Sequence, residues 1–207
     1  MMKGIRVWAL ILFIFLYPIP YTLYPVQAVE SYYPTLDGDI GYSKIHPASP
    51  FYFLKAVREN IELGLAGTPR TKMLRTLEFA IRRLRETRTL LTINQDLIPP
   101  TLEKYTALIN SLTDKHQTDD EFAIILKNNL VIHLKFLEEI YNQTLDIKAK
   151  MFIRSTMNRL IQRADTPNYA RIPICILFSK EATSASLNQT EQIVLLERAQ
   201  KCLKINR

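Results

Sequence analysis

The sequence predicts an all-α protein, an antiparallel helical bundle of about six or seven helices with a helical hairpin at each end. Three observations predict this class. Apolar residues recur at spacings of three and four through most of the chain after residue 48, which is the period of a helix face. The chain holds only five glycines, and no set of alternating β-branched runs predicts a sheet. Serine–proline and threonine–proline pairs, which start helices, precede the first two periodic segments.

The N-terminal segment, residues 1–28, has the pattern of a secretory signal peptide. Lys3 and Arg6 precede an uncharged apolar run, and Ala28 ends a stretch that suits a cleavage site. The alternative is a retained membrane anchor, since no charge occurs between Arg6 and Ala28, about the 20 residues that a spanning helix needs. Prolines in this stretch favour cleavage, because they break a spanning helix. We therefore expect an exported protein, extracytoplasmic or secreted, or one anchored at its N-terminus with the domain outside the cytosol.

Residues 29–48 are expected to form an extended lead-in arm. They are polar, rich in tyrosine and interrupted by proline and glycine. Tyr32, Tyr33 and Tyr42 are a candidate contact surface for a partner. The favoured interpretation is that these rings fold back against the first pair of helices.

Residues 49–91 are expected to form the N-terminal helical hairpin. The pair Ser49 and Pro50 starts its first helix, and the pair Thr68 and Pro69 starts its second. The apolar side of the first helix consists of Phe51, Leu54, Val57, Ile61 and Leu65, and that of the second of Leu74, Leu77, Ile81, Leu84 and Leu91. Because a short link makes the two helices antiparallel neighbours, we expect the second apolar side to face back toward the first.

Two segments of this hairpin carry a family pattern. The first is Ser49-Pro50-Phe51-Tyr52-Phe53-Leu54-Lys55, and the second is Ala80-Ile81-Arg82-Arg83-Leu84-Arg85-Glu86. Together they resemble a bacterial domain-of-unknown-function family, catalogued as number 5667, that pairs a Ser-Pro-x-Tyr-x-Leu-Lys opening with an Ala-x-Arg-Arg-Leu-x-Glu segment. The resemblance covers roughly residues 45–115. It implies an exported or membrane-tethered bacterial protein, and no activity comes with it.

Four arginines cluster between Arg82 and Arg88 on the second expected helix. One interpretation is a patch for anionic envelope polymers or lipid headgroups, in which Arg82 and Arg85 are candidate partner contacts. The favoured interpretation is a solvated helix face paired with Glu78 and Glu86. We expect no nucleic-acid binding, because no DNA- or RNA-binding motif accompanies the charge.

Three more helices complete a bundle over residues 49–165: one at about 101–115, one that begins near Thr118, and one at about 146–164. The helix after Thr118 is the longest and most apolar, so we expect neighbours on more than one of its sides. His133 lies within its apolar surface. We interpret His133 as a core or boundary histidine rather than a metal ligand or acid–base group, because no second ligand follows at helical spacing.

Residues 166–207 are expected to form a C-terminal helical hairpin packed on the bundle. Pro173 is expected to end the link that precedes it, so that the two arms run at about 174–182 and 190–204.

The only two cysteines, Cys175 and Cys202, lie on opposite arms of this hairpin. Antiparallel arms bring such positions together, and two cysteines in an exported chain are typical of one disulfide. The alternative is a pair of buried free thiols.

No catalytic motif occurs: the chain lacks a Gly-x-Ser-x-Gly elbow, a phosphate-binding loop and a zinc-binding helix pattern. We therefore predict that the protein is not an enzyme and uses no cofactor or metal. The predicted function is a binding or sensing module of the cell envelope whose partner is an envelope protein or polymer. Membrane contact is expected only through an uncleaved leader. The alternative is a structural envelope component that self-associates through spare apolar surface on the second and fourth helices.

Overall fold

The computed structural model describes residues 40–112, 119–183 and 187–205. Helix accounts for 79% of them and no strand occurs among them, which confirms the all-α class. The expected signal peptide, residues 1–28, and the arm tyrosines Tyr32 and Tyr33 lie outside the described residues.

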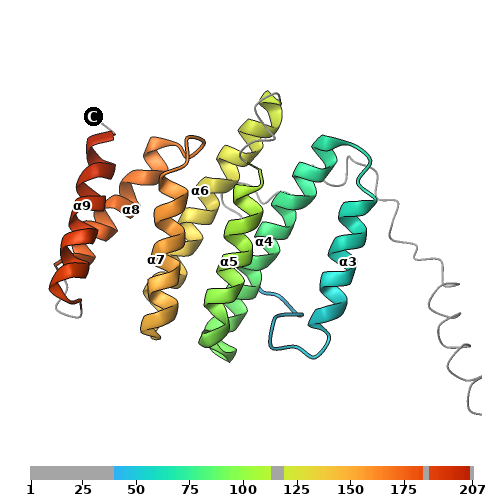
Figure 1. The fold of residues 1–207 in the computed structure, drawn as a ribbon, viewed down its shortest axis with the longest axis horizontal. Coiled ribbons are helices and arrows are strands. Elements are labelled where there is room, and N and C mark those ends of the chain that lie inside the picture. The colour runs from blue at the N-terminus through green and yellow to red at the C-terminus, as the bar shows by residue number, and fades with distance from the viewer. Residues whose placement is uncertain (1–39, 113–118, 184–186, 206–207) are drawn as a thin grey trace, which may run out of the picture. The chain divides into compact units, whose positions relative to one another are not determined.

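Seven α-helices and one 3₁₀ helix occur in these ranges, close to the bounds that the sequence predicts. They are α3 (Tyr52–Gly64), α4 (Pro69–Ile93), η1 (Gln95–Leu97), α5 (Ile98–Asn110), α6 (Asp120–Gln143), α7 (Ile147–Ile161), α8 (Asn168–Glu181) and α9 (Gln189–Ile205) (Figure 1). Polar caps fix several helix starts, since one side-chain oxygen accepts from the backbone amide three residues on. The capping residues are Thr68, Asp119, Asp146 and Asn188.

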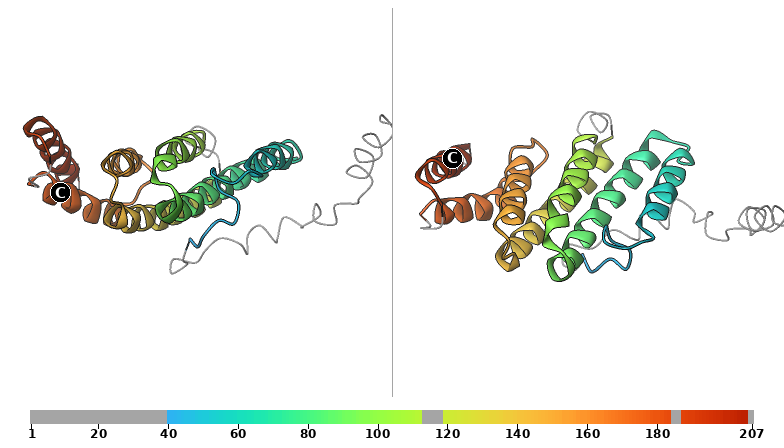
Figure 2. Two further views of the ribbon diagram at one scale, coloured as in Figure 1. Left: turned by 90° about the horizontal axis from the view of Figure 1, so that it is seen from below. Right: turned by 60° about the horizontal axis from the view of Figure 1, so that its bottom comes forward.

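The helices pack in two layers (Figure 2). In one layer α4 contacts α6, and α6 contacts α8. In the other layer α5 contacts α7, and each helix of this layer also contacts a helix of the first. The chain therefore alternates between the layers, from α4 to α5, from α6 to α7 and from α8 to α9, while α3 contacts α4.

The apolar core is built from the facing sides of α4, α5, α6 and α7. Fully buried side chains include Leu77 and Leu84 of α4, Leu102 and Ile109 of α5, Leu130 and Leu137 of α6, and Ile153 and Met157 of α7. Because α6 contacts α4, α7 and α8, the prediction that the fourth helix has neighbours on more than one side is confirmed. It is not the longest helix among the described residues, since α4 has 25 residues and α6 has 24. The large apolar residues exposed on α4 and α6 are Ile93 and Ile124 alone among the described residues, so these helices offer little spare apolar surface.

The prediction that Pro173 ends the link before the C-terminal hairpin is wrong, because Pro173 lies inside α8, which begins at Asn168. Proline has no amide hydrogen and therefore cannot bond to the carbonyl of Tyr169, one turn back. The helix continues because its apolar side, with Ile174 and Phe178, is buried against its neighbours. That burial outweighs the loss of one hydrogen bond.

The N-terminal hairpin forms, but α3 packs with its opposite side. The residues expected to face α4 are 52 to 69% exposed: Phe51, Leu54, Val57, Ile61 and Leu65. No residue of α3 is buried. The expectation that two apolar sides meet is therefore wrong. The apolar side of α4 packs on α5 and α6 instead, and the side of α4 that α3 contacts carries arginines and glutamates.

Candidate functional site

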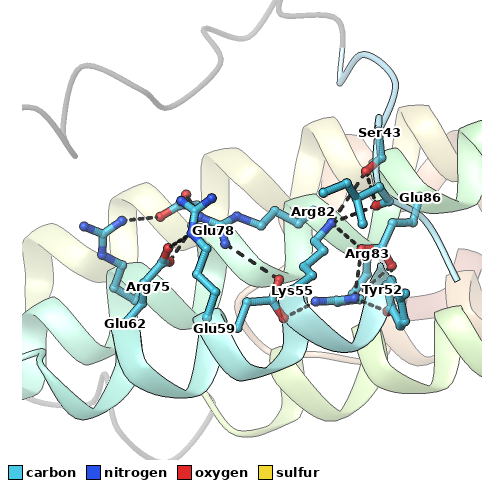
Figure 3. Close-up of polar contacts among 12 residues, drawn as sticks. Ser43, Tyr52, Lys55, Glu59, Glu62, Arg75, Glu78, Arg82, Arg83 and Glu86 are labelled. Atoms are coloured by element: carbon cyan, nitrogen blue, oxygen red, sulfur yellow. Dashed lines mark hydrogen bonds and ion pairs between the residues drawn. The ribbon is translucent and has the colours of Figure 1, made fainter. Parts of the chain in front are cut away.

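The candidate site is the charged seam between α3 and α4, which we define by Tyr52, Lys55, Glu59 and Glu62 of α3 and by Arg75, Glu78, Arg82, Arg83 and Glu86 of α4 (Figure 3). The α3 members recur at spacings of three and four, and the α4 members follow a similar rhythm. Such spacing places each set on one side of its helix, so the two sets face each other.

Glu86 is the centre of the charged seam, and its side chain has no exposed surface. The Nζ atom of Lys55 lies 2.5 Å from one carboxylate oxygen of Glu86. Nη1 of Arg83 donates to both oxygens at 2.8 Å, and the hydroxyl of Tyr52 donates to one of them at 3.1 Å. Arg83 also contacts the Tyr52 hydroxyl and the carboxylate of Glu59. One buried carboxylate thus joins three donors from two helices.

Arg82 is the second junction of the seam. Its Nη2 donates to Glu78 at 2.6 Å and to Glu62 at 3.2 Å, and its Nη1 lies 3.7 Å from Glu59. Arg75 holds the other oxygen of Glu78 at 2.8 Å. Glutamates of both helices are therefore bridged by one guanidinium group.

The charges of the seam balance. Its four cations are Lys55, Arg75, Arg82 and Arg83, and its four carboxylates are Glu59, Glu62, Glu78 and Glu86. Removing one member of such a buried set leaves a charge without compensation, which costs several kcal/mol. The seam therefore holds α3 in place although α3 buries no residue.

The seam shifts the pKa of several members. Burial raises the pKa of Glu59 although Arg83 and Arg82 oppose it, and burial lowers the pKa of Lys55 although Glu86 opposes it. Burial and the carboxylate of Glu86 raise the pKa of Tyr52. Burial would also raise the pKa of Glu78, but Arg82 and Arg75 outweigh it, so the pKa is lowered.

These contacts decide what the seam can do chemically. Each of its carboxylates is held by at least one guanidinium or ammonium group of the seam. A carboxylate engaged in this way is poorly placed to exchange a proton with a substrate. The arrangement is suited to fastening one helix on another.

The segment before α3 is attached to the same part of α4. The amide of Ser43 donates to the hydroxyl of Thr89 at 2.9 Å, and Nζ of Lys55 lies 3.3 Å from the carbonyl oxygen of Ile45. Nε of Arg85 donates to the carbonyl of Ile40 at 2.7 Å. Arg85, a candidate partner contact in the sequence, thus binds the chain's own backbone.

The arginine cluster pairs with Glu78 and Glu86 as the sequence predicts, but its face is not solvated. Arg83 is buried, and so is Arg88, which pairs with Glu139 at 2.7 Å. The helix face is covered because α3 lies over Arg83 on one side. The ring of Tyr42, which is 69% exposed, lies 5.6 Å from the guanidinium of Arg88.

His133 forms a fully buried pair with Tyr105, whose hydroxyl lies 3.0 Å from Nδ1 of the histidine. Burial lowers the pKa of His133 to about 3, so the ring is neutral at neutral pH. The prediction of a core histidine is confirmed. Nowhere in the described ranges do three or more His, Cys, Asp or Glu side chains gather as a metal site would require.

Cys175 of α8 and Cys202 of α9 are joined as a disulfide, with their Cα atoms 6.0 Å apart. The bond fastens the last two helices to each other, and both cysteines are buried. None of the helices within the described ranges is long and apolar enough to cross a membrane.

Comparison with known proteins adds one finding. The family described as Domain of unknown function (DUF5667) matches residues 44–147. The chain belongs to this family. The DUF5667 match runs from the segment before α3 to the start of α7 and so includes the whole charged seam. No curated protein and no solved structure matches the chain.

The two sequence segments that point to DUF5667 meet in the charged seam. Tyr52 and Lys55 come from the first segment, and Arg82, Arg83 and Glu86 from the second. Both segments are recognisable in the sequence, but that they bind each other is not. The pattern that could have predicted the contact is the polar side of α3, formed by Tyr52, Lys55, Glu59 and Glu62. These residues repeat with the same helical period as the apolar residues on the other side of the helix.

Proposed function

We propose that this DUF5667 protein is a non-catalytic binding or sensing module of the cell envelope that docks through the outward side of α3. The observation that carries the proposal is the orientation of α3. The charged side of α3 is paired with α4 in the seam, and its apolar side is exposed to solvent. Exposed apolar patches on soluble domains are typical of interaction sites.

A non-catalytic role is supported by the chemistry of the polar clusters. The carboxylates of the charged seam are paired with cations, and His133 is enclosed in the core beside Tyr105. Neither cluster offers a substrate a free acid, base or nucleophile. An envelope location is supported by the disulfide between Cys175 and Cys202, because such bonds persist in oxidising compartments. The signal-peptide pattern of residues 1–28 also supports an envelope location.

The proposal is tested by labelling cysteines in intact producing cells with a small charged maleimide that does not cross the cytoplasmic membrane. The two variants are Val57→Cys, on the outward side of α3, and Leu145→Cys, on the exposed link between α6 and α7. The native cysteines do not interfere, because they are joined to each other. We expect Leu145→Cys to react in intact cells and Val57→Cys to react fully only after the envelope is solubilised.

The two parts of the proposal can fail separately. If Leu145→Cys reacts only after lysis of the cells, the envelope location is wrong. If both variants react equally in intact cells, nothing covers α3 and the docking function is wrong.

A second candidate function is a structural envelope component that acts by self-association. It is favoured by the low net charge beside the outward side of α3, where five cations face four carboxylates, because two copies can then approach each other with little repulsion.

A further inference from the structure

We propose that the outward side of α3 is the contact surface of a homodimer, in which α3 of one copy packs against α3 of a second copy. This inference rests on the docking surface proposed above and deepens the second candidate function, self-association, by naming a second copy of the chain as the occupant. We define the α3 strip as Phe51, Phe53, Leu54, Val57, Ile61 and Leu65.

The α3 strip has the spacing of a helix-pairing seam. Leu54, Val57 and Ile61 are three and four residues apart, and Gly64 continues the rhythm with no side chain to hold a partner away. This is the spacing by which amphipathic helices dock on one another. All six strip residues are 52 to 69% exposed.

The exposed area of the strip matches what a stable dimer needs. Six large side chains exposed to this degree present roughly 600 Å² of mainly apolar surface, given the area of free side chains of this size. When all of this surface is covered, two copies together bury at most about 1,200 Å², which is the lower bound of specific protein interfaces.

The charges around the strip permit a second copy to approach. The seam behind α3 contains four cations and four carboxylates, so it carries no net charge. The exposed cation on the border of the strip, Arg58, pairs with Glu62 of its own helix at 2.5 Å. With Arg58 counted, five cations face four carboxylates, so each copy carries one net positive charge beside the strip. Because that single charge is exposed and screened by salt, only a weak like-charge repulsion opposes the contact of two strips.

The same charges make a lipid surface a poorer occupant. Helices that lie on membranes place lysines and arginines beside the apolar side, where they attract anionic lipids. On α3 the ammonium of Lys55 is bound to Glu86 and the guanidinium of Arg58 to Glu62. The strip thus lacks the free cations that lipid binding uses.

Pairing also supplies what α3 lacks in a single copy. A helix of 13 residues is only marginally stable alone, and α3 buries no residue against the rest of the chain. The charged seam fixes its direction, and a second α3 would cover its apolar side. A two-fold pair closes on itself, because each strip is the complement of the other.

The first test is light scattering on the full chain, in the form in which the producing cell processes it, from about 1 μM to 1 mM. We expect a dimer that dissociates on dilution. Val57→Glu should raise the dissociation constant more than about 100-fold, because a carboxylate at the centre of an apolar contact is left unpaired. Leu145→Glu, at an equally accessible apolar residue away from α3, should dimerise as the unchanged chain does. The helical circular dichroism of both variants should be unaltered, since both positions are exposed.

The second test is cross-linking of Val57→Cys with the oxidant diamide, compared with Ile147→Cys, which is exposed on α7. Val57 lies near the middle of α3, so its two copies lie close to the two-fold axis whichever way the helices run. A covalent dimer from Val57→Cys and none from Ile147→Cys supports the proposal.

Three results would overturn the homodimer: a strict monomer at every concentration, equal cross-linking of both variants, or binding to phosphatidylglycerol vesicles that Val57→Glu abolishes in a monomeric chain. If Val57→Cys is nevertheless shielded in intact cells, the docking function stands with a different occupant.

Discussion

The Nζ atom of Lys55 lies 2.5 Å from a carboxylate oxygen of Glu86, whose side chain has no exposed surface. The two residues belong to α3 and α4, and this ion pair is part of a seam that joins the helices without a buried residue on the α3 side. The position of α3 therefore depends on charge pairing rather than on apolar burial.

The substitution Glu86→Gln tests this dependence. It removes the anion that Lys55 and Arg83 share. Arg83 keeps the carboxylate of Glu59, but Lys55 is left largely buried without its ion-pair partner. We expect the free energy of unfolding to fall by about 3 kcal/mol or more, the usual cost of an uncompensated buried charge. Urea denaturation followed by circular dichroism measures it.

The matched control is Glu121→Gln. Glu121 pairs with Arg70 at 2.7 Å, but its side chain is 63% exposed. Pairs of this kind contribute at most about 1 kcal/mol. Equal, small effects of the two substitutions would mean that the charged seam does not hold α3.

The two glutamates with shifted pKa values predict opposite effects of pH. The pKa of Glu78 is lowered from 4.5, so its contribution to stability is present above pH 4.5 and is lost as the pH falls through the folded value. The pKa of Glu59 is raised from 4.5, so its contribution is present below pH 4.5 and is lost as the pH rises through the folded value.

Unfolding free energies measured against pH check these signs. Glu78→Gln should flatten the loss of stability below pH 4.5, and Glu59→Gln should make stability rise more steeply above it. The same change of slope in both variants would contradict the assignment.

Acid destabilisation should depend on His133. Its pKa is lowered by burial from 6.5 to about 3, so the stability that the neutral ring contributes is present above pH 6.5 and is lost as the pH falls toward 3. The loss is up to about 1.4 kcal/mol per pH unit. His133→Leu should remove this slope, although it costs stability at every pH because the Tyr105 hydroxyl loses its partner. Tyr105→Phe should keep the loss of stability with falling pH, since the histidine stays buried. If His133→Leu lost stability with the same slope as the unchanged chain and Tyr105→Phe, the acid destabilisation would not come from His133.

The disulfide should contribute measurably to stability. Cys175 and Cys202 close a loop with a sequence separation of 27, and replacing both with serine should lower the free energy of unfolding by about 3 to 4 kcal/mol. Mass measurement after alkylation, without reductant, reports the bond directly. Two freely alkylated thiols in the native protein would show that the bond does not form.

Much of the helical architecture was predictable because its signals are local. The start of α4 follows from Thr68 and Pro69, whose cap and fixed backbone angle act within one turn. The prediction of a break at Pro173 was wrong because it also used only local signals. The missing amide hydrogen of Pro173 favours a break, but other helices bury Ile174 and Phe178, and the residues next to Pro173 do not encode that burial.

The charged seam was predictable in part. Pairing of the arginine cluster with Glu78 and Glu86 followed from spacing along one helix. The role of Lys55 and Glu59 did not, because their partners lie 24 to 31 positions away on a helix whose rotation about its axis is not encoded locally.

The sequence by itself determined that the chain is helical, where most of the helices begin and end, and that Cys175 and Cys202 are the two cysteines available for a disulfide. Helical periodicity, caps and chain composition are local or compositional properties. Only the tertiary structure decided which side of α3 faces inward. A helix with one apolar and one charged side packs its charged side on a neighbour that offers complementary charge. The helix α4 presents Arg82, Arg83 and Glu86 to α3, because the apolar side of α4 is packed on α5 and α6.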